Sequence, residues 1–89
     1  MRVFKTKVFS RWARREGLAD SSLCEAVSEM LQGLVDAQLG GGVVKKRVAR
    51  AGQGKRGSYR TILATNLRER WFFMFGFQRP SVTTLAMTN

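Results

Sequence analysis

The chain has 89 residues, of which 44% are hydrophobic, and its 16 lysines and arginines outnumber six acidic residues to give a net charge of +10. A chain of this length and composition forms one domain with a modest core and is not intrinsically disordered. The charge predicts nucleic acid as the partner, with an acidic protein or an anionic membrane surface as alternatives. A single cysteine and no histidine exclude an internal disulfide and argue against zinc, so we expect no metal and no cofactor.

The first segments predict a short strand and an amphipathic helix. Residues 2–7 alternate charged and less polar side chains, which is typical of a strand. Gly17 is the expected end of the helix that follows. The N-terminal residues do not resemble a signal peptide, and the sequence contains no apolar run of about 18 residues. We therefore expect a cytoplasmic protein without a membrane span. The helix has an apolar face of Val8, Phe9, Trp12 and Ala13, and a basic face of Lys7, Arg11, Arg14 and Arg15.

A second helix is predicted to end at the three glycines 40–42. Its N-cap is either Ser22, with Glu25 completing a capping box, or Asp20. Cys24 is expected to be a small buried side chain rather than a nucleophile. The predicted apolar stripe consists of Leu23, Val27, Met30, Leu31, Leu34 and Leu39.

Beyond the glycines, the pattern changes to strands. We expect strands at 43–49, 59–65 and 70–78, with a glycine-rich basic loop at 51–58 and a turn at 66–69. The aromatic run of the last strand predicts a central strand that is buried on both faces. The order β-α-α-β-β-β predicts an α+β fold in which two helices pack on one small antiparallel sheet.

A glycine-rich cationic segment near the middle of the chain carries the candidate site. Alternate residues of a strand share a face, so Lys45 and Arg47 lie together and Lys46 lies opposite. On the next strand, Arg60 lies on the face opposite Tyr59. Glycines let a backbone approach a phosphate, and arginine binds phosphate bidentately, so the pattern favours nucleic-acid binding over solvated surface charge. We predict RNA contacts from Lys46, Arg50, Arg56 and Tyr59.

RNA cleavage by this segment would have to proceed without histidine. Cations can stabilise the negative charge that develops on the phosphorane. A desolvated lysine among other cations favours its neutral form and can accept the proton of the ribose 2′-hydroxyl. Lys45 or Lys55 is then the candidate base, and Arg47 and Arg60 are the candidate phosphate ligands.

Three stretches of the sequence, MRVFKTKVFSRWARREGL, LGGGVVKKRVARAGQGKRGSYRTILA and RWFFMFGF, resemble the RelE/HigB-like toxins of type II toxin–antitoxin operons. The resemblance implies a RelE/ParE-type fold and cleavage of mRNA within the ribosome. It also implies neutralisation by a cognate antitoxin, often a helix-turn-helix protein. By position, it places Lys45 and Arg47 at cationic strand positions, Arg60 in a Gly-x-Tyr-Arg motif, and Lys55 and Arg56 in a Gly-Lys-Arg-Gly loop.

The resemblance covers residues 1–78, which we expect to form the toxin domain, whereas residues 79–89 are atypical and expected to be disordered. We hypothesise a one-base deletion. A family-like Gln-Lys-Thr-Glu-Arg-Asp-Asn-Ile, coded CAG AAG ACC GAG CGT GAC AAC ATT, reads Gln-Arg-Pro-Ser-Val-Thr-Thr after one A is lost from AAG, as at residues 78–84. The change would remove a Lys-x-Glu-Arg group near the site and weaken cleavage.

Two other functions compete with this interpretation. One is a basic nucleic-acid-binding module that uses the same segment without catalysis. The other is a ParE-like toxin that acts on DNA gyrase. The absence of histidine does not separate these functions, whereas the mapping of mRNA cleavage within translated codons would separate them.

Overall fold

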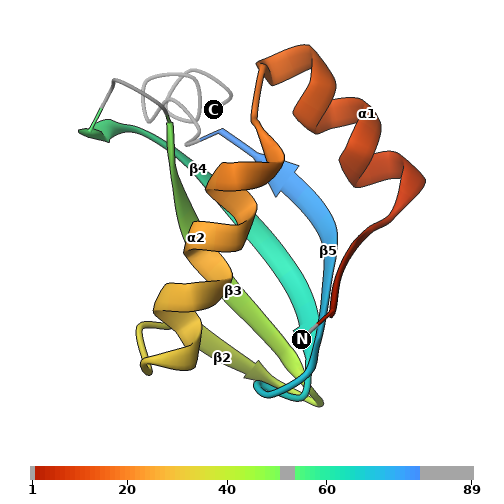
Figure 1. Cartoon of the computed structure of the whole chain (residues 1–89), viewed down its shortest axis with the longest axis vertical. Coiled ribbons are helices and arrows are strands. Elements are labelled where there is room, and N and C mark those ends of the chain that lie inside the picture. The colour runs from red at the N-terminus through yellow and green to blue at the C-terminus, as the bar shows by residue number, and fades with distance from the viewer. Residues whose placement is uncertain (1, 51–53, 79–89) are drawn as a thin grey trace, which may run out of the picture.

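Two helices and a five-stranded sheet make up the computed structural model, which describes residues 2–50 and 54–78 (Figure 1). The strand order is β1-β5-β4-β3-β2, and all neighbours are antiparallel except β1, which runs parallel to β5. The predicted α+β fold is confirmed, but the sheet is mixed and has one strand more than expected. In chain order the elements are β1 (Arg2–Lys5), α1 (Lys7–Glu16), α2 (Asp20–Leu31), β2 (Ala37–Gly40), β3 (Val43–Arg50), β4 (Gly54–Thr65) and β5 (Arg70–Phe77).

Both ends of α1 follow from local side-chain and backbone chemistry. The Thr6 hydroxyl accepts the Phe9 amide at 3.1 Å and caps the first turn. Gly17 ends the helix in the left-handed region, at φ 72°, as predicted. Phe9 and Ala13 are buried against the sheet, whereas Val8 is exposed, so the buried face is narrower than the predicted one.

The second helix, α2, is shorter than predicted. It ends at Leu31, and Gly33 at φ 95° turns the backbone away from the helix axis. Leu34 and Leu39 therefore lie outside the helix and are exposed. Neither predicted cap is correct, because Ala19 is the N-cap residue and no side chain caps the helix. Three members of the predicted stripe are buried as expected: Leu23, Val27 and Met30.

The aromatic strand β5 has one buried face and one exposed face. The expectation of a central, doubly buried strand is wrong, because β4 is the middle strand and both described helices lie on the same side of the sheet. Trp71 and Phe73 are fully buried on the helix side. Met74 is an extra residue in β5, since Ile62 and Leu63 pair with residues 75 and 73. This bulge shifts the alternation and turns later aromatic side chains outward.

A glycine brings α1 close to the sheet. A Cβ atom on Gly76 would lie 2.2 Å from Cζ3 of Trp12, so only glycine fits beneath this ring. The Trp12 ring also meets the Tyr59 ring edge-on, with centroids 5.2 Å apart. In Figure 1, α2 passes in front of β3 and β4, and α1 lies beside β5. The helices thus leave the opposite face of the sheet uncovered by either of them.

Candidate nucleic-acid interface

The face of the sheet turned away from α1 and α2, here called the open face, collects three of the predicted site residues. Val44, Lys46 and Val48 of β3 are buried on the helix side, so Lys45 and Arg47 point the other way. On β4, Arg60 points to the open face because Tyr59 and Thr61 are buried on the helix side. We call Lys45, Arg47 and Arg60 the cationic trio.

The strand register places two members of the trio directly against each other. Arg47 is the cross-strand partner of Arg60. The Arg47 amide points away from β4, toward Asp36, so the two arginines form a non-hydrogen-bonded pair, in which side chains approach most closely. Like charges in this position destabilise a sheet by a few tenths of a kcal/mol up to about 1 kcal/mol. Two adjacent guanidinium groups can instead bind one phosphate group bidentately.

One carboxylate holds Arg47 in place. Oδ2 of Asp36 accepts the Arg47 backbone amide at 2.5 Å, and Oδ1 accepts Nε at 3.3 Å. The Asp36 amide in turn donates to the Lys45 carbonyl at 3.1 Å. Because β2 begins only at Ala37, the Asp36 side chain replaces the strand partner that Arg47 lacks. The Arg47 side chain nevertheless remains 59% exposed, so it can still reach a ligand.

Lys46 does not belong to this interface, which corrects its prediction as an RNA-binding residue. Its side chain is 8% exposed and lies on the helix side. The ammonium group forms an ion pair with Glu29 at 2.7 Å and donates to the Leu34 carbonyl at 2.9 Å. A buried charge needs such partners because it has lost its hydration. Lys46 therefore ties the end of α2 to β3.

Tyr59 is also placed in the core rather than on an RNA-binding surface. Its side chain is 1% exposed. The hydroxyl donates to the Glu16 carbonyl at 3.1 Å, at the last residue of α1. An aromatic ring in this position stabilises the contact between α1 and the sheet and cannot stack on a base without leaving the core.

The remaining predicted residues lie at the β3–β4 hairpin. Arg50 pairs with Gly54 across the hairpin, and Lys55 and Arg56 follow Gly54 at the start of β4. The expected loop 51–58 is thus shorter, because β4 begins at Gly54. The side chains of Arg50, Lys55 and Arg56 lie outside what the structure describes, so their predicted roles stay predictions. The predicted tail 79–89 lies outside the described residues as well.

Electrostatics favour a polyanion on the open face. Within residues 2–50 and 54–78, Lys45 and Arg60 form no ion pair, and Asp36 is the carboxylate that contacts the trio. Over the same residues, no group of three or more His, Cys, Asp or Glu could hold a metal ion. Neither α1 nor α2 has the length and apolar composition that a membrane-spanning helix requires. The arrangement can bind a phosphate group and stabilise additional negative charge on it.

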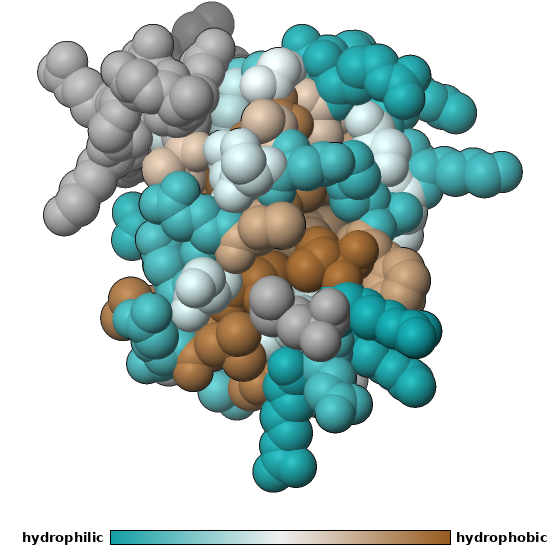
Figure 2. Space-filling model, in the orientation of Figure 1, coloured by the Kyte–Doolittle hydropathy of each residue, from teal (hydrophilic) through white to brown (hydrophobic). Residues whose placement is uncertain are grey.

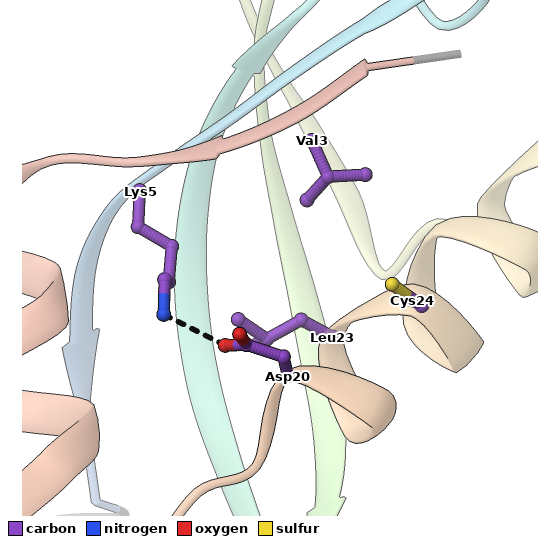
Figure 3. A pocket seen from close by; sticks show the side chains of 5 residues that line it. All are labelled: Val3, Lys5, Asp20, Leu23 and Cys24. Carbon is purple, nitrogen blue, oxygen red and sulfur yellow. Dashed lines mark hydrogen bonds and ion pairs between the residues drawn. The ribbon is translucent and has the colours of Figure 1, made fainter.

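The helix side carries a different kind of surface. Hydrophilic side chains extend outward over α1 in Figure 2, and apolar ones reach the surface near the end of α2. A pocket of about 120 Å³ lies between β1 and α2, and Lys5 pairs with Asp20 there at 2.7 Å. Figure 3 shows the side chains that line it. Cys24 at its rim is exposed, which corrects the expectation of burial. Because the lysine is already paired, we do not place the site here.

Sequence reasoning missed two features of the open face. The sequence predicts Asp36 in the interior of a long helix, but α2 ends at Leu31 and Gly33 follows with a positive φ. Phe75 and Phe77 were assigned to the core, but the bulge at Met74 turns them outward. Glycine near the end of an apolar stripe is the one signal that could have shortened the helix. No local signal marks the bulge.

Comparison with known sequences agrees with this structure. The family described as RelE toxin of RelE / RelB toxin-antitoxin system matches residues 1–87. The sequence matches no curated protein significantly. Since the family match spans nearly the whole chain and two helices on a mixed sheet are consistent with it, the protein belongs to the RelE toxin family and is the toxin of a toxin–antitoxin pair.

Proposed function

We propose that this toxin cleaves mRNA that is engaged by the ribosome, and that the cationic trio binds the RNA. One observation carries the proposal: Lys45, Arg47 and Arg60 share a face of the sheet that neither helix covers, with Arg47 opposite Arg60. Membership of the RelE family adds an antitoxin partner, for which we propose a helix-turn-helix protein. The net charge of +10 provides long-range attraction to RNA.

The trio suggests a division of labour in the reaction. Arg47 and Arg60 bind the non-bridging oxygens of the scissile phosphate and stabilise their growing charge. The ribose 2′-oxygen attacks phosphorus, the bond to the 5′-oxygen breaks, and a 2′,3′-cyclic phosphate and a 5′-hydroxyl result. Lys45, or Lys55 at the hairpin, accepts the 2′-hydroxyl proton, and the departing 5′-oxygen takes a proton from water or from a cation of the site.

Residues 79–89 bear on the strength of this activity. We propose that they replace a family-like segment after a one-base deletion, and that cleavage is weakened by the loss of its Lys-x-Glu-Arg group. The test is to reinsert one A in the Gln78 to Arg79 codons, so that the family-like frame is restored. We expect mRNA cleavage at least about tenfold faster, as for a regained acid–base or charge-stabilising group. An unchanged or slower rate would contradict this part of the proposal.

The decisive experiment is induced expression with mapping of new mRNA 5′ ends across translated genes. We expect cleavage within codons, dependent on translation, and suppression by the antitoxin. Arg60→Ala should lower the cleavage rate about a hundredfold, because it removes charge stabilisation of the phosphorane. Arg68→Ala is the matched control, because Arg68 is exposed in the turn at the other end of β4. This variant should cleave mRNA at the normal rate.

The same experiment separates the competing functions. RNA binding without new 5′ ends, even in the frame-restored chain, would favour a non-catalytic module. Growth arrest with DNA breaks at gyrase sites and intact mRNA would favour a gyrase-directed toxin. Antitoxin affinity should stay within about threefold in Arg60→Ala, so that lost cleavage is not mistaken for lost folding.

A further inference from the structure

Large aromatic side chains are exposed on the open face beside the cationic trio. Phe4, Phe72, Phe75 and Phe77 keep between 37% and 54% of their surface accessible. A cluster of large apolar side chains at the surface marks a binding site more often than a scattered single residue does. The question is which ligand needs aromatic rings and cations on the same face.

The strand register orders these side chains in rows that cross the sheet. The first row runs from Arg47 on β3 through Arg60 on β4 to Phe77 on β5. The second row runs from Lys45 through Ile62 to Phe75. Each of these two rows therefore begins with a cation on β3 and ends with an aromatic ring on β5. Neighbouring strands lie about 4.8 Å apart, so the two ends of a row are separated by roughly 10 Å.

A third row differs from these two and serves as an internal reference. It joins Val43, Ala64, Phe72 and Phe4 and contains no cation. Phe4 and Phe72 stack on each other, with ring centroids 4.7 Å apart and planes 13° apart. These rings already use one face for each other. Within the described residues, the rings of Phe75 and Phe77 stack on no other aromatic ring.

Single-stranded nucleic acid matches the first two rows. Sites for single strands combine cations along the backbone with aromatic rings on which bases stack. Sheets can present such rings to unpaired RNA bases. An apolar helix of a partner protein would also cover these aromatic side chains. Such a helix does not require three cations in the same rows, nor two arginines directly opposite each other. The charge on the same face thus favours RNA over a protein segment.

We propose that Phe75 and Phe77 stack on two successive bases of the RNA strand, whose phosphates lie along the cationic trio. This inference rests on the proposed function, because it assigns further binding residues to the same RNA site. It also assigns the site a preference for unpaired RNA, since paired bases in a duplex offer no face for stacking. Binding by stacking tolerates any base, so Phe75 and Phe77 set position more than sequence.

The test separates stacking from charge with two probes of equal charge. Fluorescence anisotropy at fixed salt measures the affinity of the full chain for a labelled ten-nucleotide oligouridine and for an abasic ribose-phosphate strand of the same length. Phe75→Leu and Phe77→Leu remove the ring but keep an apolar side chain. Phe4→Leu is the matched control, because Phe4 is similarly exposed but lies in the row without a cation.

We expect Phe75→Leu and Phe77→Leu each to weaken oligouridine binding about fivefold or more, as base stacking on aromatic rings predicts. Binding of the abasic strand should change less than about twofold. Phe4→Leu should bind both probes like the unaltered chain. Arg60→Ala should weaken both probes equally, since both carry the same phosphates. Circular dichroism should show unchanged folding in every variant, because the replaced rings are exposed.

The outcomes distinguish this inference from the proposed function beneath it. Failure of the unaltered chain to bind either probe would overturn both. Equal binding of both probes, or unchanged oligouridine binding by Phe75→Leu and Phe77→Leu, would overturn stacking alone and leave the cationic trio. Loss of antitoxin affinity in these variants with RNA binding intact would show that the aromatic rings contact a protein instead.

Discussion

Neighbouring basic residues of β3 lie in different environments on the two faces of the sheet. Lys46 points to the helices, is nearly buried, and has both an acidic partner and a carbonyl acceptor. Lys45 and Arg47, on either side of it, point to the open face, where Arg47 stands against Arg60. On the helix side a charge is neutralised within the fold, whereas on the open face, among residues 2–50 and 54–78, Asp36 is the one carboxylate that pairs with any of the three cations.

This difference separates structural charge from charge that is available for a ligand. Removing Lys46 would leave Glu29 and a carbonyl without their partner, so its position is explained by folding alone. The Arg47–Arg60 contact costs stability, by up to about 1 kcal/mol, and folding does not explain it. A bound phosphate group would turn this repulsion into attraction. Substitutions on one face at a time should therefore change either stability or RNA binding, but not both equally.

The largest effect on stability is expected on the helix side, at Gly76. A methyl group there would overlap Trp12 at 2.2 Å, so Gly76→Ala should lower the free energy of unfolding by roughly 3 kcal/mol, the upper part of the range for overpacking. Chemical denaturation measures this. Trp12→Leu should relieve the overlap, so the double variant should be destabilised by less than the sum of the single changes. Full additivity would argue against the contact.

A smaller loss is expected at Tyr59, which tests its reassignment from RNA binding to the core. Tyr59→Phe removes the hydroxyl that donates to the Glu16 carbonyl and keeps the ring. The free energy of unfolding should therefore fall by about 1 kcal/mol. Oligouridine affinity should remain within about twofold. A variant of unchanged stability with lost RNA binding would instead return Tyr59 to the interface.

The smallest effect is expected at Asp36, where one substitution changes both RNA affinity and stability. Asp36→Asn keeps an acceptor for the Arg47 amide but removes the negative charge beside the trio. We expect RNA affinity to rise about twofold to threefold at low salt, because a negative charge that repels the RNA is lost. The free energy of unfolding should change by roughly 0.5 kcal/mol. Weaker RNA binding would indicate that the carboxylate itself takes part in the site.

Sequence patterns predicted those features of the fold that local chemistry decides. Gly17 ends α1, and alternation places Lys45 with Arg47 and Arg60 opposite Tyr59, as expected, whereas the strand register is what brings Arg60 to the same face as Lys45 and Arg47. The predicted length of α2 was wrong because Leu34 and Leu39 continue the apolar spacing, whereas the helix ends at Leu31 and residues 37–40 form a hairpin with β3. Likewise, β1 is an edge strand that joins β5 in parallel, which no local pattern indicates.

The site was predicted only in part, for a related reason. Charge density predicts the segment in which we propose the site, but it does not distinguish a lysine with an acidic partner from one without. Lys46 has Glu29 as its partner only because α2 crosses β3 at that point. The exposure of Phe75 depends on one extra residue in β5. The first depends on how α2 packs on β3 and the second on the register of β4 and β5, neither of which hydrophobic periodicity reports.

Adjacent lysines allow the most direct test of the central claim that the open face binds RNA and the helix side serves folding. Lys45→Gln and Lys46→Gln make the same chemical change on opposite faces, and denaturation and oligouridine titration over a range of salt measure both properties. Lys45→Gln should weaken RNA binding severalfold and reduce the salt dependence of binding by about one phosphate contact. It should change the free energy of unfolding by roughly 0.5 kcal/mol or less. Lys46→Gln should lower unfolding free energy by roughly 1–3 kcal/mol and leave RNA affinity within about twofold. If folded Lys46→Gln lost as much RNA affinity as Lys45→Gln, the distinction between the two faces would be contradicted.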